Sequence, residues 1–309
     1  MCHALCTLRF YKLMAIQHIP VMTEEVMMFL RCEPAQTYVD ATLGGGGHAR
    51  EILRRTAPDG VVIGVEWDED AISEAKKALD PYGARVKIFR ENFIYLPDLL
   101  KVMKVKEVDG ILVDLGLSSF QLEKGERGFS FKGEGPLDMR MDQRMEHTAA
   151  DLANHFSPEE LETTLSEYGE ERWANRIATA MVRERNRSPI LTTQALKKVV
   201  CQAIPKRFQP KKIDPATRTF QALRIKVNDE LENLRKILGM GWTFLKSGGR
   251  MCVISFHSLE DRIVKETFRK LEIERMMHIL TKKPVTPSEE ERKRNPRSRS
   301  AKLRCAERV

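Results

Sequence analysis

Apolar runs alternate with amphipathic segments through the first third of the chain. Four short apolar runs predict strands, and they span Tyr38–Leu43, Val61–Glu66, Arg85–Phe89 and Gly110–Asp114. Apolar positions at helical spacing predict helices between them, over His48–Thr56, Glu69–Leu79 and Ile94–Met103. This alternation is typical of βαβ units and a mostly parallel sheet. Because ligands of such sheets bind outside the carboxyl ends of the strands, we expect the chemistry where these strands end.

The α/β pattern stops after Asp114 and resumes only near Met251. A glycine-rich loop runs to about Asp142, and loops of this length are usually functional. Ser157-Pro158-Glu159-Glu160 then begins a helix with an N-cap, a first-turn proline and a capping-box glutamate. Further helices are predicted over Glu170–Asn186, Thr193–Ala203 and Asp214–Val227, the last continuing or restarting through Leu245. Met251–Ser255 predicts another strand, and Ser258 begins a helix to about Leu271.

These elements predict one α/β domain that is interrupted by a helical insertion. We place an N-terminal extension at residues 1–17, the first part of the α/β domain at 18–124 and the mostly helical insertion at 125–212. The second part, at 213–309, ends in a basic tail. The 309 residues are enough for one large domain or two smaller ones.

The glycine loop at residues 44–47 follows a predicted strand and precedes a predicted helix. Glycines let the backbone approach a ligand closely, and the helix start offers unpaired N–H groups. Gly44, Gly46 and Ala49 satisfy a loose dinucleotide pattern, which alone is weak. Asp40 would repel a pyrophosphate and attract a ligand with an ammonium or sulfonium group. We therefore favour S-adenosylmethionine (AdoMet) over a dinucleotide, with a glycine turn that binds nothing as the alternative.

Polar and aromatic residues follow the other strand ends, and each has two interpretations. Glu66 is placed to accept hydrogen bonds from ribose hydroxyls, or to favour the start of the next helix. Phe93 would pack against an adenine face or belong to the core. Asp114, Ser118 and Gln121 would lie at the rim of the same crevice, although a serine there is usually only a turn residue.

Three other segments are also open to two interpretations. The loop at residues 128–142 either contacts a base or an anion, or ties the two parts of the protein together. His257, at the end of a strand, either forms a wall of the site or has a structural role. The formal net charge is +8, and residues 291–309 contribute +6 of it. This tail is either a solvated charge run or a contact for RNA phosphates.

The remaining composition narrows the class of protein. The six cysteines show no metal-binding spacing, so we expect reduced thiols, no metal and a cytoplasmic location. No apolar run approaches the length of a membrane-spanning helix, and the N-terminus lacks the features of a secretion signal. We therefore expect no membrane partner, and the oligomeric state is left open.

Specific motifs are spread over the chain from residue 18 onward. They are His18-Ile-Pro-Val-Met, Gly44-Gly-Gly-Gly-His48, Asp114-Leu-Gly-Leu-Ser-Ser, Glu126-Arg-Gly-Phe-Ser-Phe, Gly135-Pro-Leu-Asp-Met-Arg-Met-Asp142, Tyr168-Gly-Glu-Glu, Pro215-Ala-Thr-Arg-Thr-Phe-Gln-Ala222 and Ile254-Ser-Phe-His-Ser-Leu-Glu-Asp-Arg-Ile-Val264. With them the chain resembles the MraW-like ribosomal RNA cytosine-N4 methyltransferases, which methylate a cytidine in the decoding region of small-subunit (16S) rRNA.

The resemblance implies a Rossmann-like AdoMet-dependent methyltransferase fold with an inserted helical domain that helps to bind substrate. It implies AdoMet contacts at Gly46, Gly47, His48, Glu66, Phe93, Asp114 and Gln121. The family commonly has Asp where this chain has Glu66 and Pro where it has Phe120. The implied partner is small-subunit rRNA, in an assembled or nearly assembled subunit.

The implied reaction needs a proton acceptor, because the lone pair of cytosine N4 is delocalised into the ring. Asp114 is the first candidate and Ser118 the second. The target base must also leave its stack to enter the site. Two other functions stay open: a non-catalytic RNA-binding assembly factor, and an AdoMet enzyme acting on DNA or protein.

Overall fold

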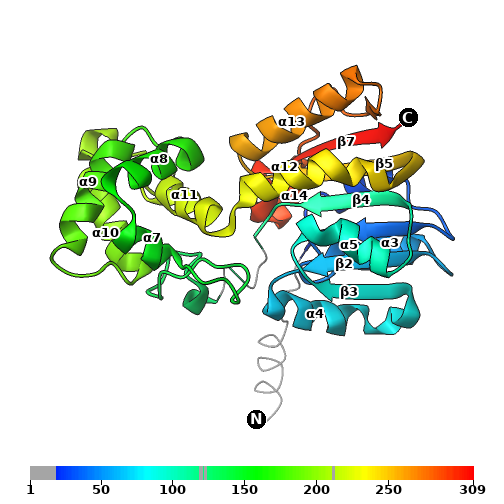
Figure 1. Ribbon diagram of the computed structural model, residues 1–309, viewed down its shortest axis with the longest axis horizontal. Coiled ribbons are helices and arrows are strands. Elements are labelled where there is room, and N and C mark those ends of the chain that lie inside the picture. The colour runs from blue at the N-terminus through cyan, green and yellow to red at the C-terminus, as the bar shows by residue number, and fades with distance from the viewer. Residues whose placement is uncertain (1–18, 118–120, 122–123, 211–212) are drawn as a thin grey trace, which may run out of the picture.

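The computed structural model describes residues 19–117, 121, 124–210 and 213–309. These residues form two lobes, with a sheet and its helices in one and a group of helices in the other (Figure 1). The sheet confirms the predicted α/β fold class. The predicted extension, residues 1–17, and Ser118 lie outside the described residues.

The described residues include seven strands of one sheet in the order β3-β2-β1-β4-β5-β7-β6. Their bounds are β1 (Thr37–Asp40), β2 (Val61–Glu66), β3 (Val86–Arg90), β4 (Val108–Asp114), β5 (Leu245–Ser255), β6 (Met277–Ile279) and β7 (Lys302–Arg308). The first five run parallel, as predicted, whereas β7 is antiparallel to β5 and to β6. The predicted first strand is shorter than expected, because the chain turns after Asp40 to enter the glycine loop.

Helices cover both faces of the sheet because successive strand residues point to opposite sides. On one face, α2 (Thr23–Leu30), α3 (Gly47–Arg55) and α4 (Glu69–Leu79) pack in a core that includes Tyr38 and Leu112. On the other, α5 (Leu96–Val102), α12 (Glu230–Met240) and α13 (Ser258–Ile273) pack in a core that includes Val39 and Ile111. The chain neighbours Tyr38 and Val39 therefore belong to different cores, and the result is a three-layer domain.

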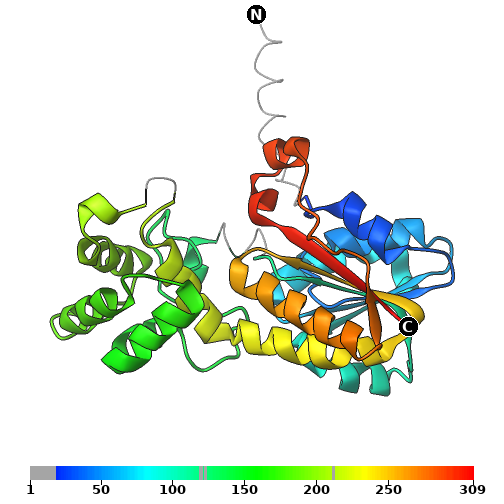
Figure 2. The same cartoon turned by 90° about the horizontal axis from the view of Figure 1, so that it is seen from above.

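The second lobe, a group of helices, lies apart from the sheet (Figure 2). Among the described residues it has its own hydrophobic core, built from five helices. These are α7 (Ala149–His155), α8 (Pro158–Gly169), α9 (Ala174–Arg185), α10 (Thr193–Ala203) and α11 (Thr217–Asn228). The predicted capping box of α8 is confirmed, because Ser157 Oγ accepts from the Glu160 amide and the Glu160 carboxylate accepts from that of Ser157. The helix is interrupted at Asp229. The φ of 49° at this residue ends α11 before α12 begins.

Helix α11 links the two lobes. It begins after residue 212, where we ended the predicted insertion, yet Phe220 and Leu223 pack in the core of the helical lobe. Ile225, near the other end of the same helix, packs in a core of the α/β lobe. The division of the chain into domains at 124 and 212 stays a prediction, but the packing of α11 places its first turns with the helical lobe.

The basic tail is a structural part of the sheet, and the interpretation of it as a solvated charge run is wrong for its last residues. Helix α14 (Glu289–Arg294) and a 3-10 turn, η6 (Pro296–Ser300), lead into β7. Strand β7 lies between β5 and β6, with Leu303, Cys305 and Ala306 fully buried. Arg304 nearby forms an ion pair with Asp261 of α13, with 2.6 Å between Nε and Oδ1. These residues cannot leave the sheet to contact RNA without breaking it.

No helix in the described ranges is long and apolar enough to cross a membrane.

A core residue of β7 tests the structural role of the tail. Leu303→Ala removes a fully buried side chain, so we expect it to lower the free energy of unfolding by about 2–5 kcal/mol. Arg299→Ala, at an exposed position of η6, should change it by less than about 0.5 kcal/mol. Urea unfolding followed by circular dichroism measures both. Equally small changes in the unfolding free energy for both variants would contradict a structural role of the tail in the sheet.

Candidate cofactor and active site

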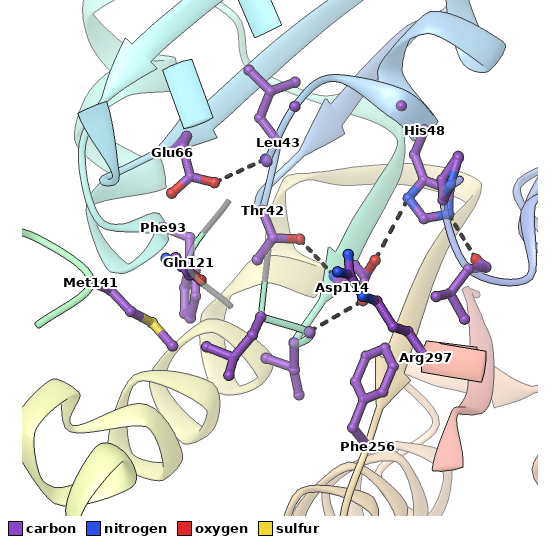
Figure 3. Close-up of a pocket in the computed structure, with 18 of the residues that line it drawn as sticks. Thr42, Leu43, His48, Glu66, Phe93, Asp114, Gln121, Met141, Phe256 and Arg297 are labelled. Carbon is purple, nitrogen blue, oxygen red and sulfur yellow. Dashed lines mark hydrogen bonds and ion pairs between the residues drawn. The ribbon is translucent and has the colours of Figure 1, made fainter. Parts of the chain in front are cut away.

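A cavity of about 310 Å³ opens at the carboxyl ends of β1, β2 and β4, on the side that faces the helical lobe. The α/β lobe contributes the glycine loop, Glu66 and Asp114 to its lining. The helical side contributes Met141 and Arg224. Figure 3 shows Glu66, Asp114 and Met141 around a common space. The cavity therefore lies where the sheet topology predicts a ligand, at the switch between β1 and β4.

The glycine loop forms one wall, but its four glycines differ in what they face. A Cβ atom built on Gly44, whose φ is +51°, has only the Thr42 carbonyl oxygen within 4 Å, at 3.9 Å. One built on Gly46, whose φ is +80°, would lie 3.0 Å from a methyl carbon of Leu79 in α4. Gly46 is not part of the cavity lining, whereas Gly44, Gly45 and Gly47 are. Gly46 is thus needed for the turn and for packing on α4, and its contact with AdoMet stays a prediction.

Asp40 does not face the cavity directly, so the attraction that we predicted for a cationic ligand would act from beneath the glycine loop. Its carboxyl group is buried and is not part of the cavity lining. Burial raises the pKa of Asp40 to about 6, while His48 lowers it and Asp114 raises it. One carboxylate oxygen, Oδ2, has no hydrogen-bond partner in the described structure. Asp40 therefore supports the loop from beneath, and the acid that faces the cavity from this part of the sheet is Asp114.

Asp114 and His48 form the polar centre of this wall. His48 Nε2 lies 2.9 Å from the carbonyl oxygen of Val21, which can only accept, so this nitrogen carries the proton. The other ring nitrogen, Nδ1, lies 3.7 Å from Asp114 Oδ2. The Gly116 amide donates to Asp114 Oδ1, and the Thr42 hydroxyl accepts from the Asp114 amide. Burial raises the pKa of Asp114 above that of an ordinary aspartate, and His48 opposes this effect.

Glu66 is held by backbone amides at the end of β2. Its Oε1 accepts from the amides of Trp67 and Asp68, both at 2.9 Å, and its Oε2 accepts from the Gly44 amide at 2.8 Å. A carboxylate oxygen has two lone pairs, so Oε2 keeps one acceptor position on the cavity side. Burial raises the pKa of Glu66 to about 7, although the three amides favour the ionised form. This arrangement suits a ligand hydroxyl that donates to the remaining position.

Aromatic rings stand beside Glu66. Phe93, in the 3-10 turn η2 (Phe93–Tyr95), packs in a core of the α/β lobe, which confirms the core interpretation. It also lines the cavity, so its contact with an adenine stays a prediction. Trp67 lies next to it, with 6.4 Å between the ring centroids. Sequence reasoning missed Trp67, although its position directly after Glu66 was a signal. Both rings are placed to contact the flat face of a base.

The long loop after β4 is anchored to the start of α4. Gln121 lines the cavity and donates from Nε2 to Asp68 Oδ2 at 2.9 Å. Arg127 is buried and forms an ion pair with the same carboxylate, with 3.0 Å between Nη2 and Oδ2. It also donates to the carbonyl oxygens of Arg140 and Met141. The loop at residues 128–142 is therefore ordered and ties the lobes together, and only Met141 of it lines the cavity.

The far wall comes from residues that the sequence did not single out. Arg224 of α11 and Glu230 of α12 form a two-pronged ion pair, with both N–O distances 2.8 Å. Arg297 of η6 also lines the cavity, so the basic tail contributes to the site after all. His257 is not part of the lining: its Nδ1 accepts from the Glu260 amide, which makes it the cap of α13. In the described part of the chain, no cluster of His, Cys, Asp or Glu could hold a metal ion.

The buried carboxyl of Glu66 makes stability depend on pH in a defined direction. Its pKa rises from 4.5 to about 7 on folding, so the folded state binds more protons between these values. The stability that wild type has relative to Glu66→Gln should therefore fall as pH rises from 4.5 to 7, by about 3 kcal/mol at most. Urea unfolding at a series of pH values measures the difference. If the stability difference between wild type and Glu66→Gln does not change with pH, or changes in the opposite direction, the amides keep this carboxylate ionised.

Comparison with known proteins assigns the family. The model of the MraW methylase family matches residues 15–309. Ribosomal RNA small subunit methyltransferase H of Desulfotalea psychrophila is 53% identical over 292 residues, which cover 94% of this chain and 98% of that protein. The protein of the same name from Halothermothrix orenii is 48% identical over 309 residues, which cover 95% and 99%. The cavity is thus the candidate active site of a chain that belongs to the MraW methylase family.

Proposed function

We propose that this protein transfers a methyl group from AdoMet to N4 of a cytidine in the decoding region of 16S rRNA. Membership of a methylase family and the names of its relatives support the coarser statement, an AdoMet-dependent methyltransferase of small-subunit rRNA. The cytidine, the N4 position and the decoding region rest on the resemblance of the motifs. The observation that carries the proposal is a cavity with an acid, Asp114, at the end of the central strand β4.

The residues present fit AdoMet. Glu66 keeps one acceptor position for a ribose hydroxyl, and Phe93 and Trp67 are placed to pack against an adenine. Gly44 leaves open space at the loop, and Asp114 offers a carboxylate near a cationic ligand. We propose Gly47, His48 and Gln121 as further cofactor contacts from the lining. Gly46, which shapes the loop beside them, would contact AdoMet only through its backbone. When bound, AdoMet supplies an electrophilic methyl group.

The chain's own groups prepare the cytosine amino group. We propose that Asp114 accepts a hydrogen bond from N4, which localises the lone pair, and then takes the proton that N4 loses. Its raised pKa suits a proton acceptor, and the Gly116 amide, which donates to Oδ1, fixes its orientation. Holding N4 in line with the methyl group contributes several kcal/mol, up to about 7–11. Ser118 stays a second candidate outside the described residues.

The single most informative experiment identifies the product. Tritiated AdoMet is incubated with small ribosomal subunits that lack the modification, and the labelled nucleoside is identified after digestion. We expect N4-methylcytidine in the small-subunit rRNA. Label in DNA or in ribosomal protein would support the rival enzyme class. AdoMet binding without transfer to any substrate would support an assembly factor that has kept the fold. A cytoplasmic location, where subunits mature, is part of this proposal.

Asp114→Asn separates a catalytic role from cofactor binding. Asparagine keeps the size of the side chain but cannot take a proton, so the single-turnover rate at saturating AdoMet should fall about a hundredfold or more. AdoMet affinity, measured by calorimetry, should fall far less than the rate, although the variant removes one carboxylate near the cationic ligand. In wild type this rate should rise with pH and reach a plateau above the pKa of Asp114, because only the ionised acid accepts. A normal saturated rate with weakened AdoMet binding would assign Asp114 to the cofactor and make Ser118 the next candidate.

A further inference from the structure

Two aromatic rings on the helical lobe are surrounded by arginines. Trp173, just before α9, and Phe208, in the 3-10 turn η4 (Lys206–Phe208), have their ring centroids 5.3 Å apart. The Arg172 guanidinium lies 5.7 Å from the Trp173 centroid and 6.0 Å from that of Phe208. The Arg176 guanidinium lies 5.8 Å from the centroid of Trp173, and the Arg207 guanidinium lies 4.6 Å from that of Phe208. We call these five residues the arginine–aromatic cluster.

The cluster is exposed and its charge is not neutralised. Phe208 keeps 44% of its surface accessible, which is unusual for a large apolar side chain, and the three arginines are exposed. None of these arginines lies within 4.0 Å of a carboxylate oxygen of the described residues, whereas Arg127, Arg140 and Arg224 elsewhere are all paired. The cluster therefore presents flat aromatic surface and positive charge together, and the fold does not use that charge internally.

A groove continues from the cluster along the same helix. It lies between α9 and α10, has a volume of about 320 Å³ and is lined by Arg176, Thr179 and Arg183 on one side and Gln202 on the other. The spacing of 176, 179 and 183 places the three side chains on one face of α9. Arg176 belongs both to the groove and to the cluster. Glu184 is the one carboxylate of the described lining, so hydrogen-bond donors dominate this surface.

We propose that the arginine–aromatic cluster and this groove bind an unpaired segment of the substrate RNA, at a second contact remote from the active-site cavity. Helices α9 and α10 lie at the end of the helical lobe that is farther from the sheet (Figure 1). The inference rests on the proposed function, because it assumes an RNA substrate, and it adds where and in which form that RNA is held.

The chemistry favours single-stranded RNA over a duplex. Bases stack on exposed aromatic rings only when their faces are free, and arginines beside the rings neutralise the adjoining phosphates. A duplex hides the faces of its bases, so it would use the charges and leave Phe208 without a ligand. An acidic protein segment would also satisfy the arginines, but it offers no flat partner for two neighbouring rings.

The test uses the full chain and two fluorescent RNA probes. One is a fragment of small-subunit rRNA that carries the target cytidine and unpaired flanks, and the other is a fully paired hairpin of the same length. Phe208→Ala removes an exposed ring, so affinity for the first probe should fall between about fivefold and a hundredfold, with little change for the hairpin. The double variant Arg172→Gln, Arg176→Gln should flatten the log–log salt slope by about 1.4, the loss of two single-strand phosphate contacts.

A matched control and a local signal make the result specific. Arg235→Gln with Arg269→Gln removes two exposed charges from α12 and α13 and should leave both probes unaffected. RNA should quench the fluorescence of wild type more than that of Trp173→Phe, which keeps a ring. AdoMet affinity should be unchanged in every variant, which shows that the fold and the cavity are intact.

The outcomes separate this inference from the proposed function. If wild type binds and methylates RNA and the cluster variants do the same, the inference is overturned and the proposed function stands. If wild type binds neither probe and yields no labelled nucleoside, the proposed function fails as well. Variants that bind both probes normally but bind assembled subunits weakly would assign the cluster to a ribosomal protein, which also overturns the proposal.

Discussion

Three neighbouring parallel strands each end on a buried or largely buried acid, and the rest of the site depends on this constraint. Asp40, Glu66 and Asp114 are the last residues of β1, β2 and β4, and burial raises the pKa of all three. Parallel strands bring their carboxyl ends to one edge, so the three charges are forced together. Three backbone amides offset the free-energy cost of burying the Glu66 carboxylate. His48 partly offsets this cost for the carboxylates of Asp40 and Asp114. A cationic ligand at this edge would offset more of it, which is a physical reason for AdoMet here.

The helical lobe completes the site rather than merely lying beside it. Arg127 anchors the loop after β4 to α4, and Asn228 of α11 donates to the Met139 carbonyl and accepts from the Met141 amide. These buried bonds fix Met141 at the cavity. They also fix the orientation of α11, which brings Arg224 to the far wall. A substrate that contacts the helical lobe is thereby presented to the edge of the sheet where Asp114 lies.

The sequence and the tertiary structure contribute different information about the tail. The tail resembles a solvated segment because it contains Lys302, Arg304 and Arg308. Its charged residues alternate, however, with Leu303 and Cys305, which are buried. This alternation is a strand signal, but the high charge concealed it. The charges are compatible with an interior strand because they find partners on neighbouring elements. Arg304 pairs with Asp261 of α13, and Glu307 pairs with Arg250 of β5. In the ladder between β5 and β7, Cys252 lies opposite Cys305, and no local sequence pattern could have connected these two positions.

By itself, the sequence determined what depends on neighbouring residues: the parallel βαβ order, the glycine turn, the acids at the strand ends, the cap at Ser157 and the family motifs. It could not determine which way each group points. Gly46 faces Leu79 and Asp40 lies beneath the loop, although both stand beside cavity residues in the chain. The tertiary structure alone brought Arg224 and Arg297 to the site, because α11 and η6 reach it from separate parts of the chain. Local spacing sets strand ends and turns, whereas the walls of a cavity are set by packing between distant segments.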